Sequence, residues 1–325
     1  MATDTLEHHD VAHAEGKADW DGGNAPMKAS YGKLMMWYFL LSDAFTFAGF
    51  LIAYGTLRVM MPTWPVPDFV FQLFPFMGHT SLPLMFVTLM TFILLFSSWT
   101  MVRAVQEGQR ENQSGVAVWM FLTILGGAAF LGCQAWEWTT LIVKENMTVT
   151  TNPFGTHIES GVYIDNDGKE TKDVFEAGEP YLIHVIGQHH GDDEHADEDH
   201  AADGHEASTE YVPHHDEPGD YTDAFIDEKG YIHKKFKVTE GEDAGVIKSQ
   251  AFGPKAFGGL FFFITGFHGF HVLSGVLFLI IIFVNVMSGL YVKRKNGYEM
   301  VEKMGLYWHF VDLVWVFVFL LFYLL

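Results

Sequence analysis

The chain has 325 residues, of which 49% are hydrophobic and 16% aromatic, and its formal net charge is −21. This acidity argues against nucleic acid as a partner, and the single cysteine, Cys133, excludes a disulfide framework or a paired-cysteine metal site within the chain. The hydrophobic residues are concentrated in long blocks, which is typical of a membrane protein.

The negative charge belongs mainly to one segment. Residues 145–254 contain 26 acidic and 7 basic side chains, a net charge of −19, so the rest of the chain is close to neutral. We therefore divide the chain into a polar tail at 1–32, three transmembrane helices within 33–144, an acidic, histidine-rich insert at 145–254, and two more transmembrane helices within 255–325. Because the first 30 residues are polar and acidic, we expect no cleavable signal peptide.

The predicted fold class is all-α, a bundle of five transmembrane helices with a β-hairpin-containing insert between helices three and four. Each hydrophobic block has at least the roughly 20 residues that a bilayer requires. Pro62, Pro65 and Pro67 end the first helix, and the fourth block is so long that its helix must tilt or extend beyond the lipid. The helices are expected at 34–61, 81–103, 116–143, 257–292 and 304–325.

Basic residues in the short loops predict the orientation of the bundle. They precede helix one, separate helices two and three, and separate helices four and five, so with five spans they all fall on one side. That side is cytoplasmic by the positive-inside rule, so we expect a cytoplasmic N-terminus and a periplasmic insert and C-terminus. The residues concerned are Lys28, Lys33, Arg103, Arg110, Lys293, Arg294, Lys295 and Lys303.

The insert contains two β-type runs, GVYIDNDGKE and DAFIDEKGYI, each broken by a polar turn. Asp167-Gly168 and Lys229-Gly230 have the turn chemistry of β-hairpins. Between the two runs, residues 187–210 form a tract rich in His, Asp and Glu. This tract is either a metal-capturing surface or a solvated linker, and we favour the linker because its composition disfavours a rigid ligand shell.

Costly polar side chains mark the predicted interior of the bundle. Asp43 is an isolated carboxyl deep in helix one, where an ionisable group requires a partner, a cavity or a proton. Tyr307 and Trp308 in helix five are expected near the cytoplasmic membrane interface, where such aromatics are enriched. Spacings of three place further polar residues on shared helical faces. We predict one interhelical polar network from Gln134, Glu137, Thr265, His268, His271, His309 and Asp312.

Two other functions remain open at this point. His268 or His271, together with His309, would form a haem-ligating pair on facing helices. Asp43 and Glu137 are intramembrane carboxylates of the kind that transporters use. We favour neither function, because a Thr-x-x-His-x-x-His face is more often a hydrogen-bonding patch, and because five helices do not divide into two repeats.

The sequence resembles subunit III of the haem–copper cytochrome c oxidases and the related quinol oxidases. The resemblance covers all five helices but neither the tail nor the insert. The family has a seven-helix form and a five-helix bacterial form, and the resemblance is nearest to the five-helix form, which implies a bacterial inner membrane. In the seven-helix form the first two helices make one wall of a lipid-holding cleft, and this chain does not contain them. The motifs are FLLSDAFTFAGF, FLGCQAWEW, FFFITGFHGFHVLSGV and YWHFVDLVWVFVFLLFY.

The resemblance also assigns individual residues. Asp43, after Ser42, stands where the family usually has a carbodiimide-reactive Glu. Gln134 and Glu137 match the family's Gln-x-x-Glu motif, with Trp138 in place of the following Tyr. The Thr-Gly-Phe-His-Gly and Trp-His-Phe-Val-Asp patterns correspond to residues 265–269 and 308–312, and His271 follows at the family's spacing.

By this resemblance the chain is a non-catalytic subunit of a proton-pumping terminal oxidase, and haem and copper belong to its partner subunits. It is expected to stabilise subunit I, to contact subunit II and small oxidase subunits, to bind structural phospholipid and to support proton uptake. The insert would steer a basic cytochrome c or, as we favour, clamp a neighbouring respiratory complex. Association with a nitric oxide reductase is an alternative within the family.

Overall fold

The computed structural model describes residues 30–72, 74–75, 83–165, 168–186, 225–293 and 297–325. The tail up to residue 29 and the tract at 187–210 lie outside these ranges. Among the described residues, five helices are long and hydrophobic enough to cross a membrane, which confirms the predicted multi-pass helical bundle. They are α1 (Tyr31–Met60), α3 (Met85–Gln109), α4 (Gln113–Thr139) with the π-helical turn η2 (Thr140–Lys144), α5 (Lys255–Met287), and α7 (Glu299–Phe319) with the π-helical turn η4 (Leu320–Leu324).

Several helix ends differ from the predicted ones. Helix α3 continues to Gln109, where a tight turn begins and the Asn112 side chain accepts a hydrogen bond from the Gly115 N–H at the start of α4. Helix α5 stops at Met287, because Gly289 adopts a φ of +70°, and a separate short helix, α6 (Leu290–Lys293), follows. Hydrophobicity does not mark where the backbone hydrogen bonds of a helix stop, so a helix can end after its hydrophobic block, as α3 does, or before the block ends, as α5 does.

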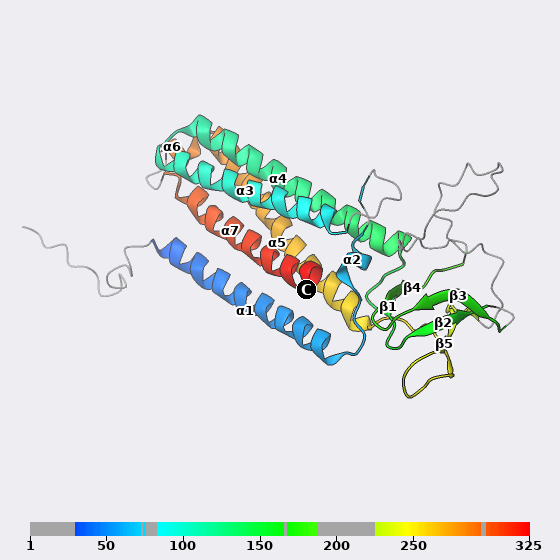
Figure 1. Ribbon diagram of the computed structural model, residues 1–325. Coiled ribbons are helices and arrows are strands. Elements are labelled where there is room, and N and C mark those ends of the chain that lie inside the picture. The colour runs from blue at the N-terminus through cyan, green and yellow to red at the C-terminus, as the bar shows by residue number, and fades with distance from the viewer. Residues whose placement is uncertain (1–29, 73, 76–82, 166–167, 187–224, 294–296) are drawn as a thin grey trace, which may run out of the picture.

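The five helices form a bundle in which α1 lies at the edge (Figure 1). Helices α3 and α4 are antiparallel neighbours, α4 packs against α5, and α7 packs against both α3 and α5. Helix α1 contacts α5 and α7, and its buried residues Leu40, Phe47 and Tyr54 are seven positions apart. Because that spacing covers one narrow stripe, most of α1 is left for lipid or for another chain.

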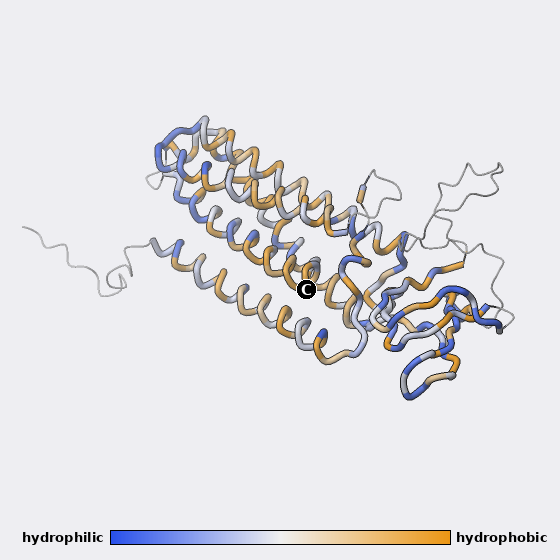
Figure 2. Tube along the Cα trace, in the orientation of Figure 1, coloured by the Kyte–Doolittle hydropathy of each residue, from blue (hydrophilic) through white to orange (hydrophobic). Residues whose placement is uncertain are grey.

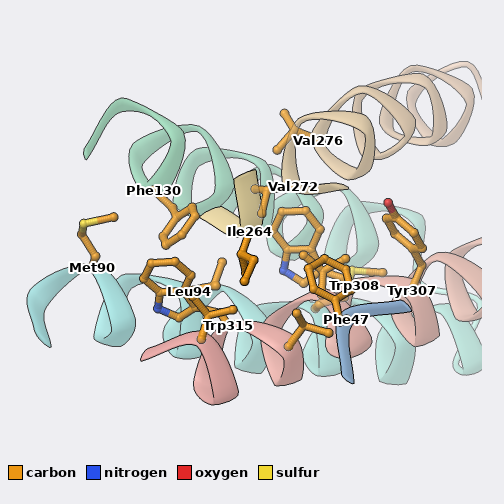
Figure 3. Close-up of a cluster of buried hydrophobic side chains, with 14 of the residues drawn as sticks. Phe47, Met90, Leu94, Phe130, Ile264, Val272, Val276, Tyr307, Trp308 and Trp315 are labelled. Carbon is orange, nitrogen blue, oxygen red and sulfur yellow. The ribbon is translucent and has the colours of Figure 1, made fainter. Parts of the chain in front are cut away.

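Glycines allow large aromatic side chains to enter the bundle. A Cβ atom at Gly127 of α4 would lie 2.6 Å from Cη2 of Trp308, and one at Gly275 of α5 would lie 2.9 Å from Cζ3 of the same ring. Trp308 therefore fills the space that the two glycines leave between helices (Figure 3). Phe130 and Trp315 meet edge to face further along the bundle, with ring centroids 4.8 Å apart.

The insert folds into a small β region at the end of the bundle where α4 ends and α5 begins (Figure 1). Hydrophobic residues fill the helices, whereas hydrophilic residues gather at the helix ends and in the β region (Figure 2). One antiparallel pair joins β1 (Phe154–Thr156) to β4 (Pro180–Leu182), and a four-stranded antiparallel sheet has the order β3-β2-β5-β6. Its strands are β2 (Gly161–Ile164), β3 (Glu170–Phe175), β5 (Lys235–Val238) and β6 (Ile247–Ser249).

The two predicted β-type runs are joined in one structure. Strands β2 and β3 form the first hairpin, with Gly168 at a φ of +77°, while Asp167 lies outside the described residues. The second run closes through a bridge between Ile226 and Ile232, with Gly230 at a φ of +83°. Strand β5, which follows the second run, pairs with β2 of the first run, and the separate turn signals did not predict this pairing.

The β region is attached to the membrane helices at several points. The Thr156 hydroxyl donates a hydrogen bond to the backbone carbonyl of Trp64, 2.9 Å away, in the loop after α1. The Asn152 side chain donates to the carbonyl of Pro254, directly before α5. The short helix α2 (Pro67–Val70) follows Trp64 in the chain and packs against η4. The insert is therefore anchored on the bundle.

Candidate functional site

The most enclosed carboxyl in the bundle is that of Glu137, near the end of α4. It accepts hydrogen bonds from the Tyr323 hydroxyl, at 3.1 and 3.2 Å, and from Gln134 Nε2, at 3.0 Å, and it is 4% exposed. A cavity of about 20 Å³, lined by Glu137, Thr140 and hydrophobic side chains, lies beside it and has room for one water molecule. Gln134 and Glu137 thus act together, as their spacing predicted, and their partner is on η4.

Asp43 and His271 form a contact between α1 and α5. His271 Nε2 lies 3.2 Å from Asp43 Oδ2, and His271 Nδ1 lies 2.8 Å from the carbonyl of Phe267. Because a carbonyl can only accept, Nδ1 carries a proton, and the contact between Nε2 and the carboxyl must contain a second proton. The pair is therefore either a neutral acid bonded to a neutral imidazole or an ion pair, and in both forms it links α1 to the bundle.

Tyr307 and Trp308, which we predicted near the cytoplasmic membrane interface, are buried between helices. They are 6% and 1% exposed. The Tyr307 hydroxyl donates to the His271 carbonyl at 3.1 Å and lies 2.8 Å from Ser274 Oγ, while Trp308 Nε1 donates to Ser97 Oγ at 3.2 Å. Helix α7 begins at Glu299, so both residues are about two turns inside the helix and face its neighbours. Their position at the interface stays a prediction.

His309 and Asp312 face α3. His309 Nδ1 lies 2.7 Å from Ser98 Oγ, and Ser98 also lies near the Asp312 carboxyl. Asp312 is 8% exposed, and its Oδ1 is buried without a hydrogen-bond partner among the described residues. His309 and Asp312 thus lie on one face of α7, and His309 is the one that contacts the Ser98 hydroxyl directly.

His268 is fully buried and surrounded by aromatic rings. Trp315 stacks on it with centroids 5.2 Å apart, and Phe130 meets it edge to face at 5.8 Å. In the described part of the chain neither ring nitrogen has a hydrogen-bond partner. The imidazole thus fills a place in the aromatic core and joins no polar group that the structure describes.

The single polar network that we predicted is divided into separate contacts. Thr265 donates to the Phe261 carbonyl of its own helix, His268 turns toward α4 and α7, and His271 turns toward α1. Residues three apart on a helix differ by about 60° in direction, which is enough for them to face different neighbours in a closely packed bundle. The contacts are Glu137 with Gln134 and Tyr323, Asp43 with His271, and His309 and Asp312 with Ser98.

The sequence analysis missed the hydroxyl groups that complete these contacts. Ser97 and Ser98 lie next to each other in α3 and serve Trp308 and His309, and Tyr323 serves Glu137. Serine is common in transmembrane helices and carries no charge, so hydropathy gave little reason to select these residues. A usable signal was that each of these hydroxyls is a polar group inside a hydrophobic block, where it requires a hydrogen-bond partner.

Outside the membrane helices, burial strongly shifts the pKa of His157 in the β region. Burial lowers its pKa to about 4, because charging the imidazole would require water that the site excludes. The ring stacks on Phe175 at 3.7 Å, its Nε2 lies 2.8 Å from the Tyr163 hydroxyl, and it is 4% exposed. Within the described ranges no three His, Cys, Asp or Glu side chains converge as a metal site would require.

These features define a multi-pass membrane protein in which polar groups such as Asp43 and Glu137 join its own helices. Residues 239–325 match the family model described as cytochrome c oxidase subunit III. The matched segment contains α5 and α7 and therefore most of the polar residues considered above.

Curated relatives agree with that match. The probable cytochrome c oxidase subunit 3 of Rickettsia prowazekii (strain Madrid E) is 37% identical over 95 residues, which is 29% of each chain. The quinol oxidase subunit 3 of Bacillus subtilis (strain 168) is 29% identical over 162 residues, covering 45% of this chain and 74% of the relative. The cytochrome c oxidase subunit 3 of Schizophyllum commune is 41% identical over 92 residues, covering 28% and 32%.

The chain thus spans less than a third of the rickettsial and fungal relatives and about three quarters of the Bacillus one. Together with the family match, this similarity supports the resemblance to subunit III of the haem–copper oxidases that the motifs indicated. The matched segment begins at residue 239, so it includes β6 and the last residues of the insert but not strands β1 to β5.

Proposed function

We propose that the chain is a non-catalytic subunit that stabilises subunit I of a terminal oxidase and supports its proton uptake during oxygen reduction. The observation that best supports this is the use of its intramembrane polar groups. Glu137 is engaged by Tyr323, and Asp43 is engaged by His271, each across a helix–helix contact. Such contacts hold a scaffold together, whereas a redox centre or a transport path needs groups that are free to bind.

Copurification tests this function directly. A tagged chain purified from its own membrane in mild detergent is expected to bring with it a large subunit that carries haem and copper, together with subunit II and small subunits. The chain separated from that complex should show no haem absorption of its own. A Soret band in the separated chain would instead support the haem-ligating alternative, and substrate movement into liposomes by the chain alone would support a transporter.

The outer surface of α1 is the proposed meeting place for subunit I or for structural phospholipid. Trp37, Phe45 and Ile52 are 62%, 71% and 68% exposed on this helix. Hydrophobic side chains of this size are stable in lipid or against another membrane chain. Removal of the chain should therefore leave subunit I assembled but short-lived during turnover, which oxygen-consumption traces of the depleted complex would record.

The electron donor separates two versions of the proposal. The rickettsial and fungal relatives are named as cytochrome c oxidase subunits, whereas the relative with the most complete coverage of those cited is named a quinol oxidase subunit. We favour cytochrome c, with the acidic insert on the periplasmic side of a bacterial inner membrane. Oxygen consumption by the purified complex with reduced cytochrome c, and separately with a quinol, decides between them.

The insert is proposed to hold a neighbouring subunit or respiratory complex. Its ordered sheet and its attachment through Thr156 and Asn152 suit a rigid contact surface. Deletion of residues 160–245 should release a copurifying partner from the assembly while the membrane helices remain. If the assembly and its turnover with cytochrome c are both unchanged, neither the clamp nor the steering of a donor operates.

A further inference from the structure

The four-stranded sheet of the insert has hydrophobic residues on both of its faces. On one face Phe175, Phe236 and Val238 are buried and form a small core. The residues of β2 that point the other way, Val162 and Ile164, are hydrophobic as well. An antiparallel sheet with one face in water commonly has polar residues on that face. The composition of β2 therefore predicts a cover on the second side of the sheet, here called the outer face.

A row of paired residues crosses the outer face from edge to edge. Val174 of β3 pairs with Val162 of β2, and Val162 also pairs with Lys237 of β5. Lys237 pairs in turn with Ile247 of β6. Neighbouring strands lie about 4.8 Å apart, so the row spans roughly 14 Å. Val174 and Ile247 are 67% and 60% exposed, on a sheet that lies beyond the ends of the membrane helices (Figure 1). Large hydrophobic side chains are thus uncovered at both ends of the row.

The outer face is basic, although the insert as a whole carries a net charge of −19. Lys235 and Lys237 alternate with buried residues in β5, so both point to this face. Lys237 Nζ lies 2.7 Å from Glu170 Oε1 of β3, and this contact across β2 shows that the two side chains share one side of the sheet. Lys235 has no ion pair among the described residues and lies over the ring of Phe225. A carboxylate brought to this face would therefore meet a positive charge that the face does not balance.

The two edges of the sheet are protected against pairing with another strand. Strand β3 carries the charged residues Glu170, Lys172 and Asp173. Strand β6 is only three residues long and has Lys248 at its centre. Charged side chains and short edge strands are devices that prevent strand addition. A partner would thus bind the side chains of the outer face and would not extend the sheet.

We propose that the outer face binds an acidic part of a neighbouring protein subunit, whose own surface presents a hydrophobic strip beside carboxylates. The hydrophobic row supplies the centre of the contact, and Lys235 and Lys237 determine the charge of the partner. The exposed pair of Lys237 with Glu170 contributes little stability, so Lys237 can exchange this carboxylate for one on the partner. This inference deepens the contact role proposed for the insert and rests on that role for the presence of a neighbour. The same lysines repel a basic cytochrome c, which would have to meet a different surface.

Photo-crosslinking in the membranes that contain the whole complex tests the outer face directly. The photoreactive residue p-benzoylphenylalanine replaces Val174 or Ile247, one at each end of the row, and the crosslinked peptide is identified by mass spectrometry. We expect both positions to capture the same segment of another protein, with Asp or Glu beside hydrophobic residues. Lys237→Glu should lower the crosslinked fraction at least about tenfold, because like charges across an interface are costly. Replacement of the captured carboxylate by lysine should restore the crosslink.

Lys248→Gln is the matched control for Lys237→Gln. Lys248 lies beside Ile247 in β6, but it pairs with the buried Phe236 and therefore points to the opposite side of the sheet. Its loss should leave the crosslinked fraction unchanged, whereas Lys237→Gln should give a fraction between those of Lys237→Glu and the unaltered protein. Hydrogen exchange of β2 verifies that the sheet is retained in each variant.

Three results would overturn the proposal. They are no protein crosslink from either position, capture of a basic cytochrome c or of this same chain, and an equal crosslinked fraction in Lys237→Glu and the unaltered protein. Copurification of the haem-bearing subunit is scored in the same samples. Loss of that subunit would contradict the proposed function, whereas its presence without a crosslink would contradict only the role of the outer face.

Discussion

The membrane bundle and the β insert protect their buried polar groups in different ways. In the bundle the carboxyls of Asp43 and Glu137 are bonded to side chains of other helical segments, His271 and Tyr323. In the insert His157 lies among aromatic rings, contacts the Tyr163 hydroxyl, and is kept uncharged by burial. The buried carboxyls of the bundle therefore depend on partners across helices, whereas the buried histidine of the insert depends on staying unprotonated, and the two regions should respond to different perturbations.

The largest effect is expected from acid acting on the insert. His157 has a pKa of about 4 when folded against an ordinary value of 6.5, so the unfolded state binds the proton more readily. Stability is therefore complete above about pH 6.5, falls as the pH drops toward 4, and loses up to roughly 3 kcal/mol below that. Hydrogen exchange of β2 and β5 between pH 7 and pH 4 measures the loss.

His157→Phe supplies the control for this effect. The variant keeps an aromatic ring against Phe175 but cannot take up a proton, so the β strands should lose less of their protection on acidification. Hydrogen exchange of helices α3, α4, α5 and α7 should change little over the same pH range, both in the variant and in the unaltered protein. An unchanged pH dependence in the variant would remove His157 as its cause.

A large effect is also expected from closing the space around Trp308. In Gly127→Leu the new side chain would collide with the indole and with Val276, whose Cγ2 lies 2.8 Å from the Cβ position. Overpacking of this kind costs about 1 to 3 kcal/mol, and we expect the upper part of that range. Gly132→Leu, on the same helix but with nothing within 4 Å of its Cβ position, should be nearly neutral in thermal unfolding of the purified complex.

A middle-sized effect is expected at the enclosed carboxyl. Tyr323→Phe removes the hydroxyl that donates to both oxygens of Glu137 and should destabilise the bundle by about 1 to 2 kcal/mol. The double variant Tyr323→Phe/Glu137→Leu should lose less than the sum of the two single variants, because it leaves no unpaired carboxyl. Additive losses in a double-mutant cycle would show that the two groups do not interact.

The smallest effect is expected at the edge helix. Asp43→Asn weakens the contact with His271, and interhelical hydrogen bonds in membranes average about 0.6 kcal/mol. We expect faster hydrogen exchange in α1 alone, with α3 and α4 unchanged, since α1 packs only against α5 and α7 among the strong contacts described. If α3 and α4 loosened to the same extent, α1 would be an integral part of the bundle.

The comparison also explains what the sequence could predict. The five helices were evident because each hydrophobic block is long enough to span a bilayer, and the pairing of Gln134 with Glu137 followed from their spacing. The contacts between helices were not evident, because spacing specifies a helical face but not the neighbour that it meets. His268 and His271 illustrate this limit, as they share a predicted face yet contact different helices.

The ends of the helices set a second limit. Hydrophobicity placed the start of helix five at Met304, whereas α7 begins at Glu299. Tyr307 and Trp308 thus lie about two turns inside the helix, where both are buried against its neighbours. The pairing of β5 with β2 was likewise not predictable, since local turn signals carry no information about strands that meet across a long connection.

The hydrogen bond from Thr156 to Trp64 has a mechanical consequence. Any pull on the insert from the aqueous side is transmitted through this bond to the loop that follows α1, and through the Trp64 indole to Tyr54 inside that helix. A partner that binds the sheet would thus exert force on α1, the helix that packs least against the rest of the bundle. Force applied outside the lipid would then reach Tyr54, which lies fewer than two turns from the end of α1.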